Sequence, residues 1–244
     1  MNSGNPVLSE RAFGNPVSLV TEMTIEGTIN KTILLLALVL ITAGWTWHEF
    51  YSAKNPEAIF LHLLIGTVVG FVVGLVIIFK MEWAPVLAPL YALLEGLAIG
   101  GISAIFEIEF PGIVIQAVAL TFGTLFCLLF AYSSGFIKVT KTFWLGVVAA
   151  TGAICLFYII EIVLLVFFGI EVPFIHESGV GGIIFSIIVV CVAALNLVLD
   201  FDLIRRGAES GAPKYMEWYG AFALIVTLLW LYLEILELLG KTRS

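Results

Sequence analysis

The stretch EAIFLHLLIGTVVGFVVGLVIIF, from Glu57 to Phe79, decides the fold class of this chain. It is a nearly unbroken apolar run, and no lysine or arginine lies between Asn55 and Phe79. A helix needs about 20 mostly apolar residues to cross a bilayer, so this stretch is long enough. Because the apolar residues do not alternate with polar ones, they predict a helix and not a strand of a membrane barrel.

Six similar stretches give a total of seven predicted transmembrane helices. In chain order the seven are Thr32–Tyr51, Glu57–Phe79, Trp83–Phe106, Pro111–Tyr132, Thr142–Phe168, Gly179–Ile204 and Met216–Leu239. The chain of 244 residues is 61% hydrophobic and 12% charged, whereas an average soluble domain has about 45–50% apolar and about 25% charged residues. We therefore predict an all-α integral membrane protein with one membrane domain.

The predicted helices divide the chain into three segments. Residues 1–30 are polar, and we expect them to form a flexible cytoplasmic arm. The arm contains the sequence Gly-Asn-Pro-Val twice, beginning at Gly4 and Gly14, and Asn-Pro favours turns. Since no short apolar core precedes a small-residue cleavage site, we expect no cleaved signal peptide. Residues 31–240 form the seven-helix domain, and residues 241–244 are a short tail.

The lysine and arginine residues of the connections predict the orientation in the membrane. Eight of the eleven fall on one side of the predicted topology: Arg11, Lys31, Lys80, Lys138, Lys141, Arg205, Arg206 and Lys214. The other side has Lys54, Lys241 and Arg243. Because basic residues concentrate in cytoplasmic loops, the N-terminus is predicted in the cytoplasm and the C-terminus outside. The net charge of −7 argues against nucleic acid as a partner. The expected surroundings of the apolar spans are the lipid bilayer.

Acidic residues inside the predicted spans are the candidate functional residues, because an ionisable group at the bilayer centre is costly. Asp200 shares a helix face with Asn196, four residues earlier, so two polar side chains point the same way. Asp202 lies on a different face, and we expect it to pair with Arg205 or Arg206 in the next turn.

The last predicted span contains two further carboxylates, Glu234 and Glu237, one helical turn apart. No lysine or arginine lies between Trp218 and Gly240 to neutralise them. Glu95 lies well inside the third span and is followed by glycines at positions 96, 100 and 101, which allow close helix approach. Carboxylates on three helices with no cation between them indicate a cavity that binds cations or protons.

Four segments resemble the Bax inhibitor family. The sequence LDFDLI (residues 199–204) is similar to the family's Asp-centred motif in the sixth span. The sequence LYLEILELL (residues 231–239) is similar to its last-span motif, in which Leu-Tyr-Leu precedes an acidic residue. EGLAIG (residues 95–100) resembles its Gly-rich third stretch, and MTIEGTINKT (residues 23–32) resembles its bacterial branch.

This resemblance implies a bundle in which six helices surround the last one, in a bacterial plasma membrane. It implies a pH-sensitive, calcium-permeable leak channel, with no cofactor, closed by two carboxylates that share a proton. Those residues correspond by position to Asp200 and Glu234. Two carboxylates held close cannot both ionise cheaply, and loss of their proton would leave oxygen ligands suited to calcium. The family's usual last-span aspartate is Glu234 here, and the basic second-span latch of some bacterial members has no counterpart.

Other functions stay open on this sequence. A non-conducting regulator that binds a membrane protease or another membrane protein needs no pore, and a proton-coupled transporter also uses carboxylates at the bilayer midplane. An enzyme is not expected, because His48, His62 and His176 accompany no serine-nucleophile motif. The cysteines, all in apolar stretches, are predicted to be packing residues: Cys127, Cys155 and Cys191.

Overall fold

The computed structural model describes residues 22–53, 59–169 and 179–244. Within these residues seven helices are long and apolar enough to cross a membrane, as predicted. They are α1 (Ile25–Ala53), α2 (Phe60–Phe79), α3 (Ala84–Glu109), α4 (Ile113–Ser133), α5 (Lys141–Phe168), α6 (Val180–Glu209) and α7 (Met216–Arg243), with a short 3-10 helix η3 (Met81–Trp83) before α3. Among the described residues, the β contact is limited to an isolated bridge between Glu22 and Pro213. The all-α membrane fold is therefore confirmed.

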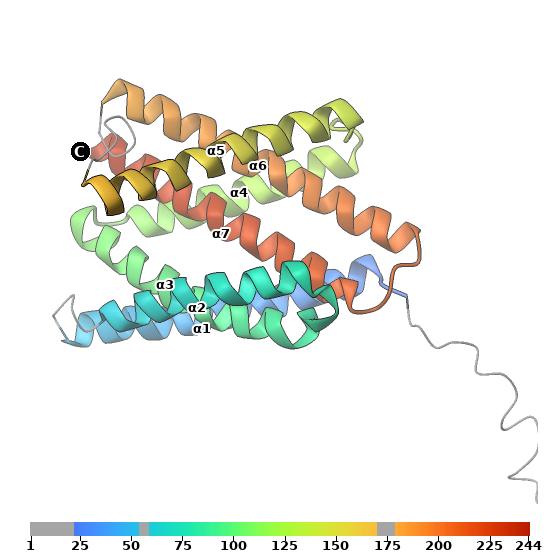
Figure 1. Ribbon diagram of the computed structural model, residues 1–244, viewed down its shortest axis with the longest axis horizontal. Coiled ribbons are helices and arrows are strands. Elements are labelled where there is room, and N and C mark those ends of the chain that lie inside the picture. The colour runs from blue at the N-terminus through green and yellow to red at the C-terminus, as the bar shows by residue number, and fades with distance from the viewer. Residues whose placement is uncertain (1–21, 54–58, 170–178) are drawn as a thin grey trace, which may run out of the picture.

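The helix α7 runs between two groups of helices (Figure 1). The helices α1, α2 and α3 lie on one side of it, and α4, α5 and α6 lie on the other. Most contacts of α7 are with α1, α3, α4 and α6, whereas α2 packs mainly on α3 and α5 mainly on α6. The prediction that six helices surround the last one is therefore not confirmed, because α2 and α5 lie at the periphery.

Burial follows this arrangement. The side chains of Ile225, Leu231 and Leu236 on α7 are fully buried, so the last helix forms much of the core. Large apolar side chains on the outer faces of α2 and α5 are exposed, including Phe71 and Phe167. An exposed apolar surface of this extent is unfavourable in water and is expected where helices face lipid.

Two glycines of α3 allow close contact with α1. A Cβ atom on Gly100 would lie 2.3 Å from the carbonyl oxygen of Ala43, and one on Gly96 would lie 1.9 Å from Oγ1 of Thr42. No side chain fits at these distances, so the glycines permit the two backbones to approach. Packing through small residues is the usual way in which helices associate within a bilayer, and it was predicted at these positions.

The chain enters and leaves the bundle at opposite ends (Figure 1). We call the end with the start of α1 and the α6–α7 connection the Lys31 end, and the end where α7 finishes the Lys241 end. Two helices extend beyond their predicted spans: α1 begins at Ile25, inside the segment assigned to the arm, and α7 continues to Arg243, through most of the assigned tail. The repeated Gly-Asn-Pro-Val sequences lie outside the described residues.

Candidate functional site

Asp200 lies on α6 at the interface with α7. Its carboxyl group lies near the side chain of Thr227, and the ring of Tyr219 lies within electrostatic reach. Its Oδ2 atom is buried and has no hydrogen-bond partner within the described part of the chain. An unsatisfied buried polar atom costs about 1–3 kcal/mol, and more when it is charged. Asp200 is therefore a residue whose placement packing alone does not explain.

Glu234 lies on α7, and its side chain is also buried. Its Oε1 atom accepts hydrogen bonds from Nε1 of Trp230, at 3.0 Å, and from the hydroxyl of Tyr158 on α5, at 3.1 Å. Trp230 lies one helical turn before Glu234, and Tyr158 reaches it from the periphery of the bundle. Two neutral donors thus satisfy one oxygen of this carboxylate without neutralising its charge.

The described contacts do not join Asp200 to Glu234. The neighbour of Asp200 on α7 is Thr227, which lies seven residues before Glu234. Seven residues of helix correspond to about 10 Å along the axis, or two turns. The described contacts therefore do not include the predicted proton-sharing pair. Asp200, on α6, faces the part of α7 near Thr227, and Glu234 lies about two turns further along α7.

A buried cation, Lys241, lies near Glu234. The sequence predicted that this lysine belongs to the C-terminal tail. The Nζ atom of Lys241 is 2.7 Å from Oε1 of Glu237 and donates to Oγ of Ser186 on α6 at 2.7 Å. The Lys241 side chain is only 6% exposed. The prediction that no cation accompanies the acidic residues of the last span is wrong, because α7 extends by one more turn and the lysine turns back along it.

Two secondary candidates make contacts that hold helices together. Asp202 forms an ion pair with Arg206, at 2.6 Å, as predicted, and its other oxygen accepts from the hydroxyl of Tyr132 at 3.1 Å. Asn196 donates to Oγ1 of Thr151 on α5 at 2.7 Å. Although Asn196 and Asp200 lie one turn apart, their side chains therefore bind different neighbouring helices.

Glu95 lies on α3, at the interface with α2. Its side chain lies near Tyr91, one turn earlier on α3, and a Cβ atom on Gly70 of α2 would lie 3.0 Å from its Oε1 atom. Within the described ranges, no group of three or more His, Cys, Asp or Glu residues is close enough to hold a metal ion. The carboxylates are thus spread along the bundle and are not gathered into one cluster among the described residues.

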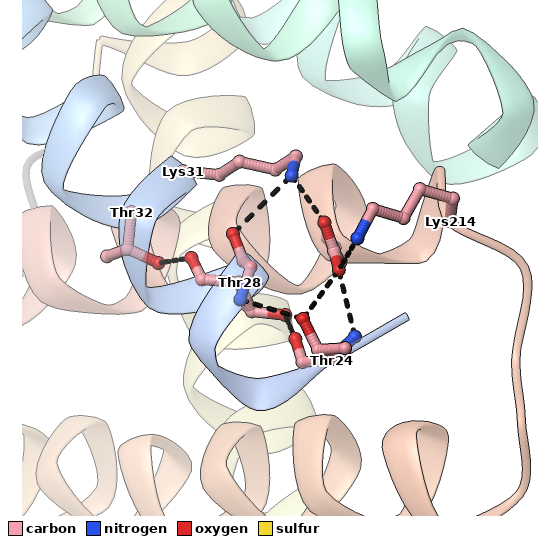
Figure 2. Close-up of polar contacts among 7 residues, drawn as sticks. Thr24, Thr28, Lys31, Thr32 and Lys214 are labelled. Carbon is pink, nitrogen blue, oxygen red and sulfur yellow. Dashed lines mark hydrogen bonds and ion pairs between the residues drawn. The ribbon is translucent and has the colours of Figure 1, made fainter. Parts of the chain in front are cut away.

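Glu217, at the start of α7, is a buried carboxylate that the sequence did not indicate as a candidate, and Figure 2 shows three of its partners, Thr24, Lys31 and Lys214. Its Oε1 atom accepts hydrogen bonds from the backbone N–H and Oγ1 of Thr24, at 2.8 and 2.9 Å, and from Nζ of Lys214 at 2.7 Å. Its other oxygen forms an ion pair with Lys31. The side chain is fully buried, and a Cβ atom on Gly27 would lie 2.2 Å from Oε1. The glycine therefore leaves the space that the carboxylate fills.

Seven apolar helices with buried carboxylates on the last two define a polytopic helical membrane protein. Residues 5–244 match the family described as Bax inhibitor 1 like, so the chain belongs to that family, as its motifs predicted. No curated protein and no solved structure matches the chain.

Proposed function

We propose that this protein is a proton-sensitive leak channel with calcium as the permeant ion. The observation that carries the proposal is the orphaned carboxyl oxygen of Asp200, buried at a helix interface inside a membrane bundle. Ionisable groups within membrane spans are expensive and mark pathways for ions or protons. The resemblance of the segments around Asp200 and Glu234 to the Bax inhibitor motifs supports the choice of calcium.

In the proposed closed state Asp200 is protonated, because a neutral acid is tolerated where an unpaired carboxylate is not. Loss of the proton places a charge between α6 and α7, and that charge requires water or a cation. The described contacts relate Asp200 to Thr227, two turns before Glu234 on α7, so we propose that the two carboxyl groups bind protons or cations in succession instead of sharing one proton. Each site then offers few oxygen ligands, which permits a calcium ion to leave as well as to enter.

We further propose that the Lys31 end faces the cytoplasm of a bacterial plasma membrane. That end and the connections at it contain seven basic residues, and cytoplasmic loops are enriched in such residues: Lys31, Lys80, Lys138, Lys141, Arg205, Arg206 and Lys214. The proposed transport requires no cofactor and no enzymatic step.

Calcium influx into proteoliposomes, measured with an enclosed fluorescent indicator, tests the proposal. Wild type is compared with Asp200→Asn and Glu234→Gln at mildly acidic and mildly alkaline pH. Glu209→Gln is the matched control, because Glu209 is also on α6 but its side chain is 60% exposed. We expect influx to rise with pH in wild type and in the control, and to lose that pH dependence in Asp200→Asn.

The absence of influx above that of empty liposomes, with folded protein at both pH values, would contradict the channel. The non-conducting regulator would then be the better proposal, and Asp200→Asn should leave binding of its membrane-protein partner unchanged. A proton-coupled transporter is distinguished by saturating uptake that acidifies or alkalinises the liposome interior in fixed proportion to the transported substrate.

A further inference from the structure

The short segment before α1, Glu22–Thr24, lies across the connection between α6 and α7. The backbone N–H of Met23 donates to the carbonyl oxygen of Ala212 at 2.7 Å, and Glu22 forms an antiparallel bridge with Pro213. These contacts join residues that are far apart in the chain, since Met23 and Ala212 are separated by 189 positions. The backbone of the segment is therefore bonded to the α6–α7 connection, at the Lys31 end of the bundle.

The side chain of Met23 lines one wall of a cavity at this end. Met23 is only 4% exposed, and a Cβ atom on Gly207 would lie 2.6 Å from its sulfur. The cavity has a volume of about 360 Å³ and is lined by Met23 together with residues of α6 and α7, among them Ile204, Gly207, Tyr219 and Gly220. The absence of a side chain at Gly207 leaves the room that the methionine fills.

The cavity leads toward Asp200. Ile204, which lines the cavity, lies one helical turn after Asp200 on α6. Tyr219, on the opposite wall, lies within electrostatic reach of the Asp200 carboxyl group. Removal of Met23 would therefore widen the approach from the Lys31 end to the buried carboxyl oxygen of Asp200, which has no hydrogen-bond partner among the described residues.

Glu217 anchors this segment. It accepts two hydrogen bonds from Thr24, the residue that follows Met23, and forms ion pairs with Lys31 on α1 and Lys214 in the α6–α7 connection (Figure 2). Removing one partner of a buried ion pair is strongly destabilising, because a buried charge loses its compensation. The anchor thus holds the position of Met23 through its direct neighbour and ties α1 to the α6–α7 connection.

We propose that Glu22–Thr24 is a strap that closes the α6–α7 cavity, with Met23 as the plug and Glu217 as the anchor. Release of the strap admits water and ions to Asp200 from the Lys31 end. The role of that access in conduction rests on the proposed function, whereas the closing of the cavity does not.

Reaction of a cysteine with a charged, membrane-impermeant thiol reagent tests the strap directly. Ile204→Cys is the reporter, because Ile204 is buried and lines the cavity, and Cys127, Cys155 and Cys191 are replaced by alanine. The protein is held in lipid nanodiscs, which expose both ends to the reagent. The labelling rate is measured with the native strap and then with Met23→Gly, with Glu217→Gln and with the exposed control Glu209→Gln.

We expect Met23→Gly and Glu217→Gln to accelerate labelling about tenfold or more, the effect of losing about 1.4 kcal/mol of closing free energy. The control should label at the native rate. Equal rates in all four proteins would overturn the strap. Met23→Gly leaves every contact of Glu217 in place, so it decides the question even if Glu217→Gln fails to fold.

A disulfide lock provides the second test. Antiparallel bridge partners have Cα atoms about 4.5–5.5 Å apart, within the range of about 4.4–6.8 Å that a disulfide accepts. Glu22→Cys with Pro213→Cys, in the same cysteine-free background, should reduce calcium influx severalfold when oxidised, with recovery on reduction. Influx that is equal in the oxidised and reduced states would overturn the gating role. Accelerated labelling in a protein without calcium influx would support the strap and contradict the channel.

Discussion

Glu217→Gln is the substitution that most directly measures how the Lys31 end is held together. Glutamine has the shape of glutamate, and its carbonyl oxygen can still accept the two hydrogen bonds from Thr24. It cannot form an ion pair with Lys31 or Lys214. The substitution therefore removes the charge of the anchor while leaving its packing and part of its hydrogen bonding.

The expected loss of free energy of unfolding depends on how exposed the side chains of Glu217, Lys31 and Lys214 are. Loss of one partner from a buried ion pair costs about 3–5 kcal/mol. Lys31 and Lys214 are 19% and 48% exposed, respectively, so both ammonium groups can turn toward water and recover part of their hydration. We therefore expect a decrease of about 2–3 kcal/mol in the free energy of unfolding, slightly below the range for a fully enclosed pair.

The assay is reversible unfolding in mixed micelles, followed by tryptophan fluorescence. Trp218 is a suitable reporter, since Nζ of Lys31 lies 5.4 Å from the centre of its ring. Glu209→Gln is the matched control, because Glu209 pairs with Arg205 at 2.8 Å at the same end of the bundle but both side chains are more than half exposed. Exposed pairs of this kind contribute little, so no measurable change is expected there.

A double-mutant cycle identifies the interaction. Lys31→Met combined with Glu217→Gln should destabilise the protein by about 1 kcal/mol less than the sum of the two single substitutions, because each one already breaks the same ion pair. The reasoning is refuted if Glu217→Gln and Glu209→Gln have equal effects, or if the effects of Lys31→Met and Glu217→Gln simply add.

Three further predictions concern other parts of the bundle. Lys241→Met removes the buried cation beside Glu237, so calcium influx should rise severalfold. The addition of Glu237→Gln should reverse that rise, and unchanged influx in Lys241→Met would exclude a role for the lysine. Gly100→Ala should destabilise the protein by about 1–3 kcal/mol through overpacking, whereas Gly123→Ala, where no atom lies within 4 Å of the new Cβ, should be neutral or stabilising in the same unfolding assay. Tyr158→Phe removes one of the two hydrogen bonds to Glu234, so it should shift the pH dependence of influx without abolishing it, and an unchanged pH profile would contradict this assignment.

The sequence predicted the elements that depend on local composition. All seven spans were found, because each one carries a continuous apolar run of bilayer length. Close helix approach at Gly96 and Gly100 and the ion pair of Asp202 with Arg206 were also predicted, since small residues and charges at helical spacing are visible in the sequence, although the partner helix α1 was not. The family was predicted from motifs near Asp200 and Glu234.

The features that the sequence did not predict depend on how helices are placed relative to one another. The level of α6 along α7 sets whether Asp200 meets Thr227 or Glu234, and no one-dimensional pattern encodes that offset. Lys241 was assigned to the tail because helix ends are the least certain boundaries. Glu217 lies outside the apolar core of the last span, and its partner Thr24 is 193 residues away, so nothing in its local sequence indicated a fully buried anchor.

Infrared difference spectroscopy of the carboxyl group tests most directly whether Asp200 exchanges a proton. Spectra of the protein in lipid are recorded at acidic and at alkaline pH, and wild type is compared with Asp200→Asn. We predict that wild type loses a protonated-carboxyl band as the pH rises, and that this band is missing from the spectrum of Asp200→Asn. An identical pH difference spectrum in both proteins would contradict a proton switch at Asp200, and with it the central claim of the proposed mechanism.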